Sequence, residues 1–190
     1  MKKIVLGVLF VSGFAFASRA QKGSILVYGT MGIRSEKQPN DDKTTVFSVY
    51  PGVGYQFCKN WTAGISGGYG QQKFTPETGS ESKTDIYRAG GFARYTYTFN
   101  TIFSLYGQGD VYYHGKKEQD VKSNGVGIAL TPTIGINVFN NFALNISFGD
   151  ISYESIKVKN ADNGTHTFDA DFGNEIKIGV SKNFGGKKIN

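Results

Sequence analysis

The sequence predicts an all-β fold, an eight-stranded antiparallel up-and-down barrel, and three observations lead to it. Eight segments carry apolar residues at every second position, which is the period of a β-strand with two unlike faces. The connections between these segments alternate between short and long. Aromatic residues form two rows on the apolar face, about ten residues apart along the strands. No stretch after Ala20 has a helical period.

The eight predicted strands follow one another along the chain. In the sixth, Val126 and Ile128 alternate with Gly127 and Ala129, so one face is apolar and the other is small and polar. Two segments contain a proline, which removes a ladder hydrogen bond, and we expect a β-bulge at each of Pro51 and Pro132. The predicted strands lie near 22–33, 44–57, 61–74, 84–99, 102–114, 124–138, 142–156 and 170–184.

The connections indicate which ends of the strands lie together. Residues 58–60, 100–102 and 139–141 form the short ones. The long ones are rich in Lys, Asp, Glu, Asn, Ser and Gly and lie near 34–43, 75–83, 115–123 and 157–169. Short turns at one end and longer polar loops at the other are typical of membrane barrels, with the short turns in the periplasm.

Antiparallel partners share a face, so three-residue turns fix the register. They place Phe57 opposite Trp61, Phe99 opposite Phe103 and Val138 opposite Phe142. The aromatic row at this end consists of Phe57, Trp61, Phe99, Phe103, Phe142 and Phe184, and the second row consists of Phe47, Tyr69, Tyr87 and Tyr113. Ten residues of tilted strand climb about 25 Å, the height of the apolar band between two aromatic girdles. The fold class is therefore a transmembrane β-barrel.

A soluble barrel of the lipocalin kind, with its apolar face inside, is the alternative. A water-facing exterior would carry many Lys and Glu residues, whereas the polar face here carries mainly Gly, Ser, Thr, Asn and Gln. Small residues suit a narrow lumen. We therefore expect the apolar face to point outward, and a secreted β-barrel or sandwich remains the second interpretation.

The first twenty residues have the zones of a signal peptide: Lys2 and Lys3, an apolar run over 4–16, and a small-residue exit at 18–20. Removing 1–20 takes the basic count from 21 to 18 against 15 acids, so the net charge falls from +6 to +3. The remaining basic residues form no run, which argues against nucleic-acid binding. Cys58 is the only cysteine, so no intramolecular disulfide forms.

Charged residues on the polar face are the candidates for a site in the lumen. An eight-stranded barrel is just wide enough for its own side chains, so we interpret them as a structural polar network. With two distant histidines and one cysteine, we expect no metal site and no cofactor. His114, near the outer end of its strand, is the one candidate for acid–base chemistry, and His166 lies in a polar loop. The predicted lumen network comprises Arg88, Arg94, Asp110, Glu175 and Lys177.

The chain resembles the small OmpA/OmpX-like outer-membrane β-barrel proteins, a porin-like group, in particular those of Bacteroidetes. The resemblance rests on the Ser18-Arg19-Ala20-Gln21 junction, the eight alternating strands and the closing run from Ile176 to Phe184. It implies insertion by the barrel-assembly machinery, which in this group often reads a terminal aromatic. Here the tail 185–190 follows Phe184, which departs from that pattern.

These observations predict a signal peptide over 1–20, an outer-membrane barrel over 21–184 and a C-terminal tail over 185–190. We expect a structural or surface-interaction protein that is not an enzyme. Its termini would lie in the periplasm, its polar loops outside the cell, and outer-membrane lipid would be its surroundings. The alternatives are an enzyme that modifies lipid A or phospholipid through His114, and a narrow pore or small-solute binder. The loop ligand is left open.

Overall fold

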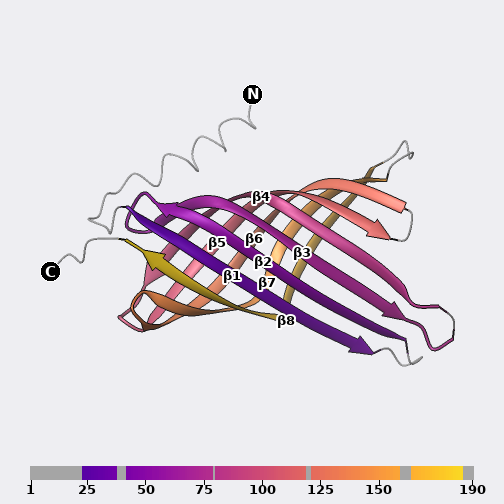
Figure 1. Ribbon diagram of the computed structural model, residues 1–190, viewed down its shortest axis with the longest axis horizontal. Coiled ribbons are helices and arrows are strands. Elements are labelled where there is room, and N and C mark those ends of the chain that lie inside the picture. Colours follow the sequence, from indigo (N-terminus) through magenta and orange to yellow (C-terminus); the bar gives the residue numbers. More distant parts are fainter. Residues whose placement is uncertain (1–22, 38–41, 79, 119–120, 159–163, 186–190) are drawn as a thin grey trace.

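The computed structural model describes residues 23–37, 42–78, 80–118, 121–158 and 164–185. Within them, eight strands form one closed antiparallel barrel in chain order, as predicted (Figure 1). The predicted signal peptide and the tail after Gly185 lie outside the described residues. The strands are β1 (Ser24–Lys37), β2 (Lys43–Gln56), β3 (Trp61–Thr75), β4 (Ser82–Thr98), β5 (Phe103–Glu118), β6 (Val121–Phe139), β7 (Phe142–Val158) and β8 (Gly164–Phe184).

The strands at the long-loop end run further than the apolar alternation indicated. Glu118 pairs with Val121 across the β5–β6 hairpin, and Lys157 pairs with Gly164 across the β7–β8 hairpin. Most residues there are polar on both faces, so the period of two disappears from the sequence while the backbone ladder continues. The predicted long loops are thus largely hairpin strands. Among the described residues, no helix is both long and apolar enough to cross a bilayer.

The start of β1 and the end of β8 lie together, because Ile25 pairs with Phe184. The short turns, which join β2 to β3, β4 to β5 and β6 to β7, lie at this same end of the barrel. Figure 1 shows both of these strand ends at the same side of the barrel. At the second turn, the Asn100 side-chain oxygen accepts hydrogen bonds from the backbone N–H groups of Ile102 and Phe103, both at 2.8 Å. Such an Asx turn closes a connection of this length. Phe99 and Phe103 are joined by a backbone hydrogen bond of 3.0 Å, as the predicted register requires.

The predicted register is wrong at the third turn. Phe139, rather than Val138, lies opposite Phe142, and the register shifts between Asn137 and Phe139. Asn140 and Asn141 have φ values of 45° and 60°, the left-handed conformation that a two-residue type I′ hairpin needs. The turn is therefore one residue shorter than expected, and the strand accommodates the extra residue as a bulge.

The two prolines behave differently. At Pro132 the β6–β7 register shifts between Leu130 and Thr133, but the extra residue is on β7, where residues 148–150 oppose 131–132, so the bulge lies on the neighbouring strand rather than at the proline. At Pro51 no shift occurs: the residue pairs with Gly29, and the β2–β3 ladder resumes in its original register. The bulge predicted at Pro51 is wrong. Because proline has no N–H to donate, the pairing with β3 lapses locally without the strand bending out of register.

The apolar face of the barrel points outward, which excludes the arrangement of a lipocalin. Large apolar side chains are exposed on every strand, for example Ile65 at 67% and Val111 at 66%. The buried side chains include polar ones such as Asn145, Ser147 and Thr133. The polar face is thus the lumen, as the composition of the two faces predicted.

Lumen-facing glycines make room for aromatic rings. A Cβ on Gly52 would lie 2.4 Å from the Tyr28 ring, and one on Gly68 would lie 2.1 Å from the Tyr50 ring. The Tyr112 ring packs in the same way against Gly127. Tyr28 and Phe92 meet edge to face at 5.3 Å between centroids. Glycine on one strand and an aromatic residue on its neighbour therefore fill the narrow interior.

We expect Gly90→Ala to destabilise the barrel by about 2 kcal/mol, because overpacking a tight interior displaces neighbouring atoms. The added Cβ would meet the Val111 carbonyl oxygen at 2.2 Å and the Tyr112 Cα at 2.7 Å, and backbone atoms yield little. Urea unfolding of the reconstituted barrel measures the effect. Gly107→Ala is the matched control, because nothing lies within 4 Å of its Cβ position. Equal stability of the two variants would contradict the packing described here.

The seam between β1 and β8 is the shortest ladder of the barrel. It runs from Ile25 and Phe184 to Gly32 and Lys177, and no pairing of β1 with β8 is found beyond it in the described residues. The β7–β8 register shifts between Ser147 and Gly149, and Gly149 has a φ of 143°. In Figure 1 the first half of β8 runs beside β7 and away from β1. The barrel wall is thus continuous around its short-turn half.

Candidate functional site in the barrel lumen

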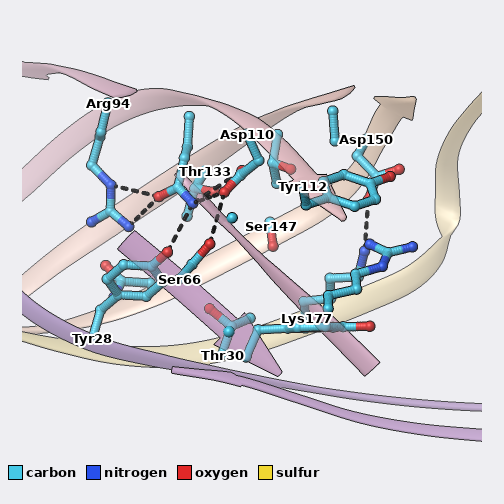
Figure 2. Close-up of a pocket in the computed structure, with 18 of the residues that line it drawn as sticks. Tyr28, Thr30, Ser66, Arg94, Asp110, Tyr112, Thr133, Ser147, Asp150 and Lys177 are labelled. Atoms are coloured by element: carbon cyan, nitrogen blue, oxygen red, sulfur yellow. Dashed lines mark hydrogen bonds and ion pairs between the residues drawn. The ribbon is translucent and has the colours of Figure 1, made fainter. Parts of the chain in front are cut away.

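Arg94 on β4 is the centre of the polar network nearest the short turns. Its guanidinium lies over the Tyr106 ring at 4.1 Å and the Tyr28 ring at 4.6 Å. Nε and Nη2 donate to the Gln108 side-chain oxygen at 3.0 and 2.6 Å. The Gln108 amide nitrogen in turn donates to Tyr28 at 3.0 Å and to the Asp110 carboxylate at 3.0 and 3.1 Å. We call this group the Arg94 layer; Figure 2 shows its hydrogen bonds as dashed lines.

Glu154 on β7 is the centre of a second network, nearer the hairpins at the long-loop end of the barrel, which we call the outer hairpins. Its Oε1 accepts from Arg88 Nη2 and from the Tyr112 hydroxyl, both at 2.9 Å. Lys116 Nζ lies 3.5 Å from Oε2, and His114 Nδ1 lies 3.9 Å from the same oxygen. The Arg88 guanidinium also covers the Tyr112 ring at 4.5 Å. We call this group the Glu154 layer; the Arg88 and Lys116 cations there share one carboxylate.

Between the two layers, Lys177 on β8 forms a 2.7 Å ion pair with Asp150 on β7 (Figure 2). The structure thus brings four of the five predicted lumen residues into the interior: Arg88, Arg94, Asp110 and Lys177. The register places Asp110 opposite Phe92 and Arg94 opposite Gln108, and Gln108 rather than a direct ion pair joins Arg94 to Asp110. The side chain of Glu175 lies outside the residues whose side chains are described.

Two cavities lie on either side of the Arg94 layer. The inner one has a volume of about 110 Å³ and is lined by both layers and by Lys177. The other, of about 690 Å³, opens among the short turns and is lined mostly by Asn, Thr and Ser side chains. Arg94, Tyr106 and Asn145 line both. These three residues therefore form the partition between the inner cavity and the short-turn mouth.

His114 lies in the Glu154 layer but is enclosed by it. Its side chain is 1% exposed, and neither ring nitrogen has a hydrogen-bond partner. The imidazole packs against Gly125, where a Cβ would lie 2.4 Å from Nε2. His166 is on the outer wall, stacked on Tyr153. Among the described residues, no group of three or more His, Cys, Asp or Glu side chains is arranged to hold a metal ion.

The predicted girdle residues lie on the outward face of the barrel. The register adds members that the sequence interpretation missed. Tyr55, Tyr95 and Tyr97 join the row near the short turns, with exposures between 39% and 52%. On the last hairpin, Tyr153 lies opposite Phe168 at the level of the second row. Phe168 was missed because β8 was expected to begin at residue 170.

The eight-stranded outer-membrane barrel is the class whose fold this chain shares. OprG of Pseudomonas aeruginosa, an outer membrane protein, superimposes with a TM-score of 0.54 at 14% identity, over 88% of this chain and 100% of OprG. Neisserial surface protein A has a TM-score of 0.49 at 14% identity, over 85% of this chain and 97% of its own. At such identities the likeness to OprG establishes the fold alone. No family model and no curated protein matches the sequence.

Proposed function

We propose that this protein is an integral outer-membrane β-barrel of structural or surface-interaction type, with a lumen closed by its own side chains. The observation that carries the proposal is the pair of unlike faces. Large apolar residues cover the outside, as in Val111 and Ile65, while arginine and carboxylate side chains fill the inside. Exposed apolar surface of this extent is incompatible with water and suits hydrocarbon. The outer hairpins are then the surface available to partners.

The finer assignment is also a proposal. The signal peptide over 1–20 and the OmpA/OmpX-like resemblance of Bacteroidetes type support export and insertion by the barrel-assembly machinery. The short turns and the termini would then face the periplasm and the polar hairpins the cell exterior. Heat modifiability tests closure: the unboiled mature protein migrates as a compact band and the boiled protein more slowly. Recovery as a detergent-free periplasmic monomer would overturn the membrane assignment.

Cys58 provides a test of orientation, because it is exposed and lies in the first short turn. We expect a membrane-impermeant maleimide to leave it unlabelled in intact cells and to label it after the outer membrane is permeabilised. The matched control is the double variant Cys58→Ala with Glu77→Cys, which moves the thiol to an exposed position between β3 and β4. That variant is expected to react in intact cells. The opposite pattern would reverse the proposed orientation.

A narrow pore has one specific observation in its favour. Cavities of about 110 and 690 Å³ lie on the two sides of the Arg94 layer, so a narrow pore requires that layer to move. An enzyme acting through His114 is less well supported, because the enclosed ring offers no route to a lipid substrate. No residue is proposed as catalytic, and no cofactor is proposed.

A further inference from the structure

Lysines recur at one position on the outward face of the barrel. They come in facing pairs on three hairpins: Lys37 opposite Lys43, Lys73 opposite Lys83, and Lys117 opposite Lys122. On the fourth hairpin Lys157 faces Gly164, and its side chain lies across that glycine. We call these seven residues, Lys37, Lys43, Lys73, Lys83, Lys117, Lys122 and Lys157, the lysine collar.

Each collar lysine lies at a fixed distance from the girdle. On β2, β3, β4, β5 and β7 the girdle residue four positions away is aromatic, as in Phe47 for Lys43 and Tyr69 for Lys73. On β1 and β6 the equivalent residues are Ile33 and Val126. Four residues of tilted strand span about 10 Å along the barrel axis. The collar therefore lies that far outside the apolar band.

The collar forms a level ring around the barrel. Between neighbouring hairpins, the pairing is displaced by two residues from the corresponding collar or girdle residue. Lys73 thus lies opposite Thr45 rather than Lys43, and Tyr87 lies opposite Gly115 rather than Tyr113. Strand tilt in a closed barrel requires a stagger of this kind for residues at equal height. Seven of the eight strands thus present a lysine at one height and on one face.

Facing lysines are unfavourable by themselves. Like charges directly opposite each other destabilise an antiparallel pair, and three such pairs occur here. Acids near the collar compensate in part: Glu81 lies 2.7 Å from Lys73, and Asp85 lies opposite Lys117. The Asp85 carboxylate already accepts from Tyr69 and Gln71. On the outward face of the described collar strands, these two carboxylates lie among seven lysines, so positive charge predominates there.

From this arrangement we infer that the lysine collar binds the phosphate-bearing headgroups of anionic lipids in the leaflet that surrounds the outer hairpins. The inference rests on the proposed membrane location, because the girdle defines where the headgroups begin. Cations placed beside a membrane surface attract its anionic lipids. The outward direction of the collar favours lipid over a soluble polyanion, which would meet the hairpin tips or the lumen mouth first. Lipid phosphates would relieve the repulsion within each lysine pair.

The test uses the full mature chain, folded in detergent and titrated with diphosphorylated lipid A or with neutral phosphatidylcholine. Native mass spectrometry measures the lipid retained. We expect the wild type to prefer lipid A by about tenfold or more at low salt, and the preference to fall as ionic strength rises. Replacing all seven collar lysines by Gln is expected to bring the ratio close to one.

Matched variants separate the collar from general charge. Lys73→Gln with Lys83→Gln removes two collar charges, and Lys59→Gln with Lys182→Gln removes two charges near the short turns. The first pair is expected to lower the preference about fivefold or more and the second to leave it unchanged. Lys117→Arg with Lys122→Arg is expected to retain it. Heat modifiability of each variant shows that the barrel has folded.

Other outcomes would overturn the inference. Equal lipid A preference in the wild type and the seven-Gln variant would remove the collar as the site. If inorganic phosphate alone displaced the bound lipid A, the collar would be a site for free anions. If the seven-Gln variant lost binding to heparin but kept its lipid preference, the ligand would be a soluble polyanion. A barrel that folds and inserts into neutral vesicles without lipid selectivity would contradict lipid binding by the collar and leave the proposed membrane location intact. A chain that does not insert into vesicles at all would contradict the proposed function as an integral membrane barrel.

Discussion

Glu154→Ala is expected to destabilise the barrel by about 2 kcal/mol, since removing one partner of a partly buried ion pair leaves the other charge and a hydroxyl without compensation. The change would leave the Arg88 guanidinium and the Tyr112 hydroxyl without their shared acceptor, Oε1 at 2.9 Å. Lys116 would lose its nearest carboxylate oxygen as well. Urea unfolding of the reconstituted protein, followed by the heat-modifiable band, measures the loss.

Two further variants identify the cause. Glu154→Gln keeps one oxygen acceptor and is expected to lose less stability than Glu154→Ala. The double change Arg88→Met with Glu154→Leu removes both charges, and we expect it to recover much of the loss, because an apolar pair of similar volume often replaces a buried ion pair without penalty. If the single and double variants were equally unstable, packing rather than charge would explain the Glu154 layer.

Arg94→Ala is expected to convert a closed lumen into a conducting one. Arg94 is 4% exposed and separates the inner cavity of about 110 Å³ from the mouth of about 690 Å³. Removing its side chain would join the two volumes and release Gln108 from its hydrogen bonds. Planar-bilayer recordings should show no steps for the wild type and resolved steps for the variant.

The controls for this prediction distinguish shape from charge. Arg94→Lys keeps the charge but loses the flat guanidinium that lies on the Tyr28 and Tyr106 rings, so brief openings are expected. Asp110→Ala leaves those ring contacts in place and is expected to stay closed. An Arg94→Ala barrel that is as closed as the wild type would place the barrier elsewhere in the lumen.

The fold was predictable because its determinants are local. Alternation along β6, the Asn-rich turns and the outward aromatics all appear in the sequence, and the eight predicted strands correspond one by one to those observed. The ends at the outer hairpins were not predictable from alternation, because Lys116 and Lys117 are both polar while the ladder continues past them. At the third turn, the left-handed conformations of Asn140 and Asn141 make a two-residue turn, so Phe139 rather than Val138 lies opposite Phe142.

The lumen network was predictable only in part. Arg94 and Asp110 lie on strands with unbroken alternation, so the polar face could be identified from the sequence. Glu154 was missed because the bulge at Gly149 reverses the faces of β7: Phe148 points outward, and after the bulge Ile151 does so. An uninterrupted period would have placed Glu154 toward lipid. The sequence does carry a signal of this bulge, because the spacing from Phe148 to Ile151 is odd, whereas an uninterrupted strand has even spacings between apolar residues of one face.

The short seam between β1 and β8 has a consequence for the order in which the barrel closes and opens. Eight residue pairs join these strands, whereas fourteen join β1 to β2. A ladder with fewer backbone hydrogen bonds opens at lower free energy than its neighbours. Within β1, amide hydrogen exchange should therefore be fastest at those positions beyond Gly32 whose N–H groups point toward β8 rather than toward β2. Closure should proceed from the pair of Ile25 and Phe184 toward the outer hairpins.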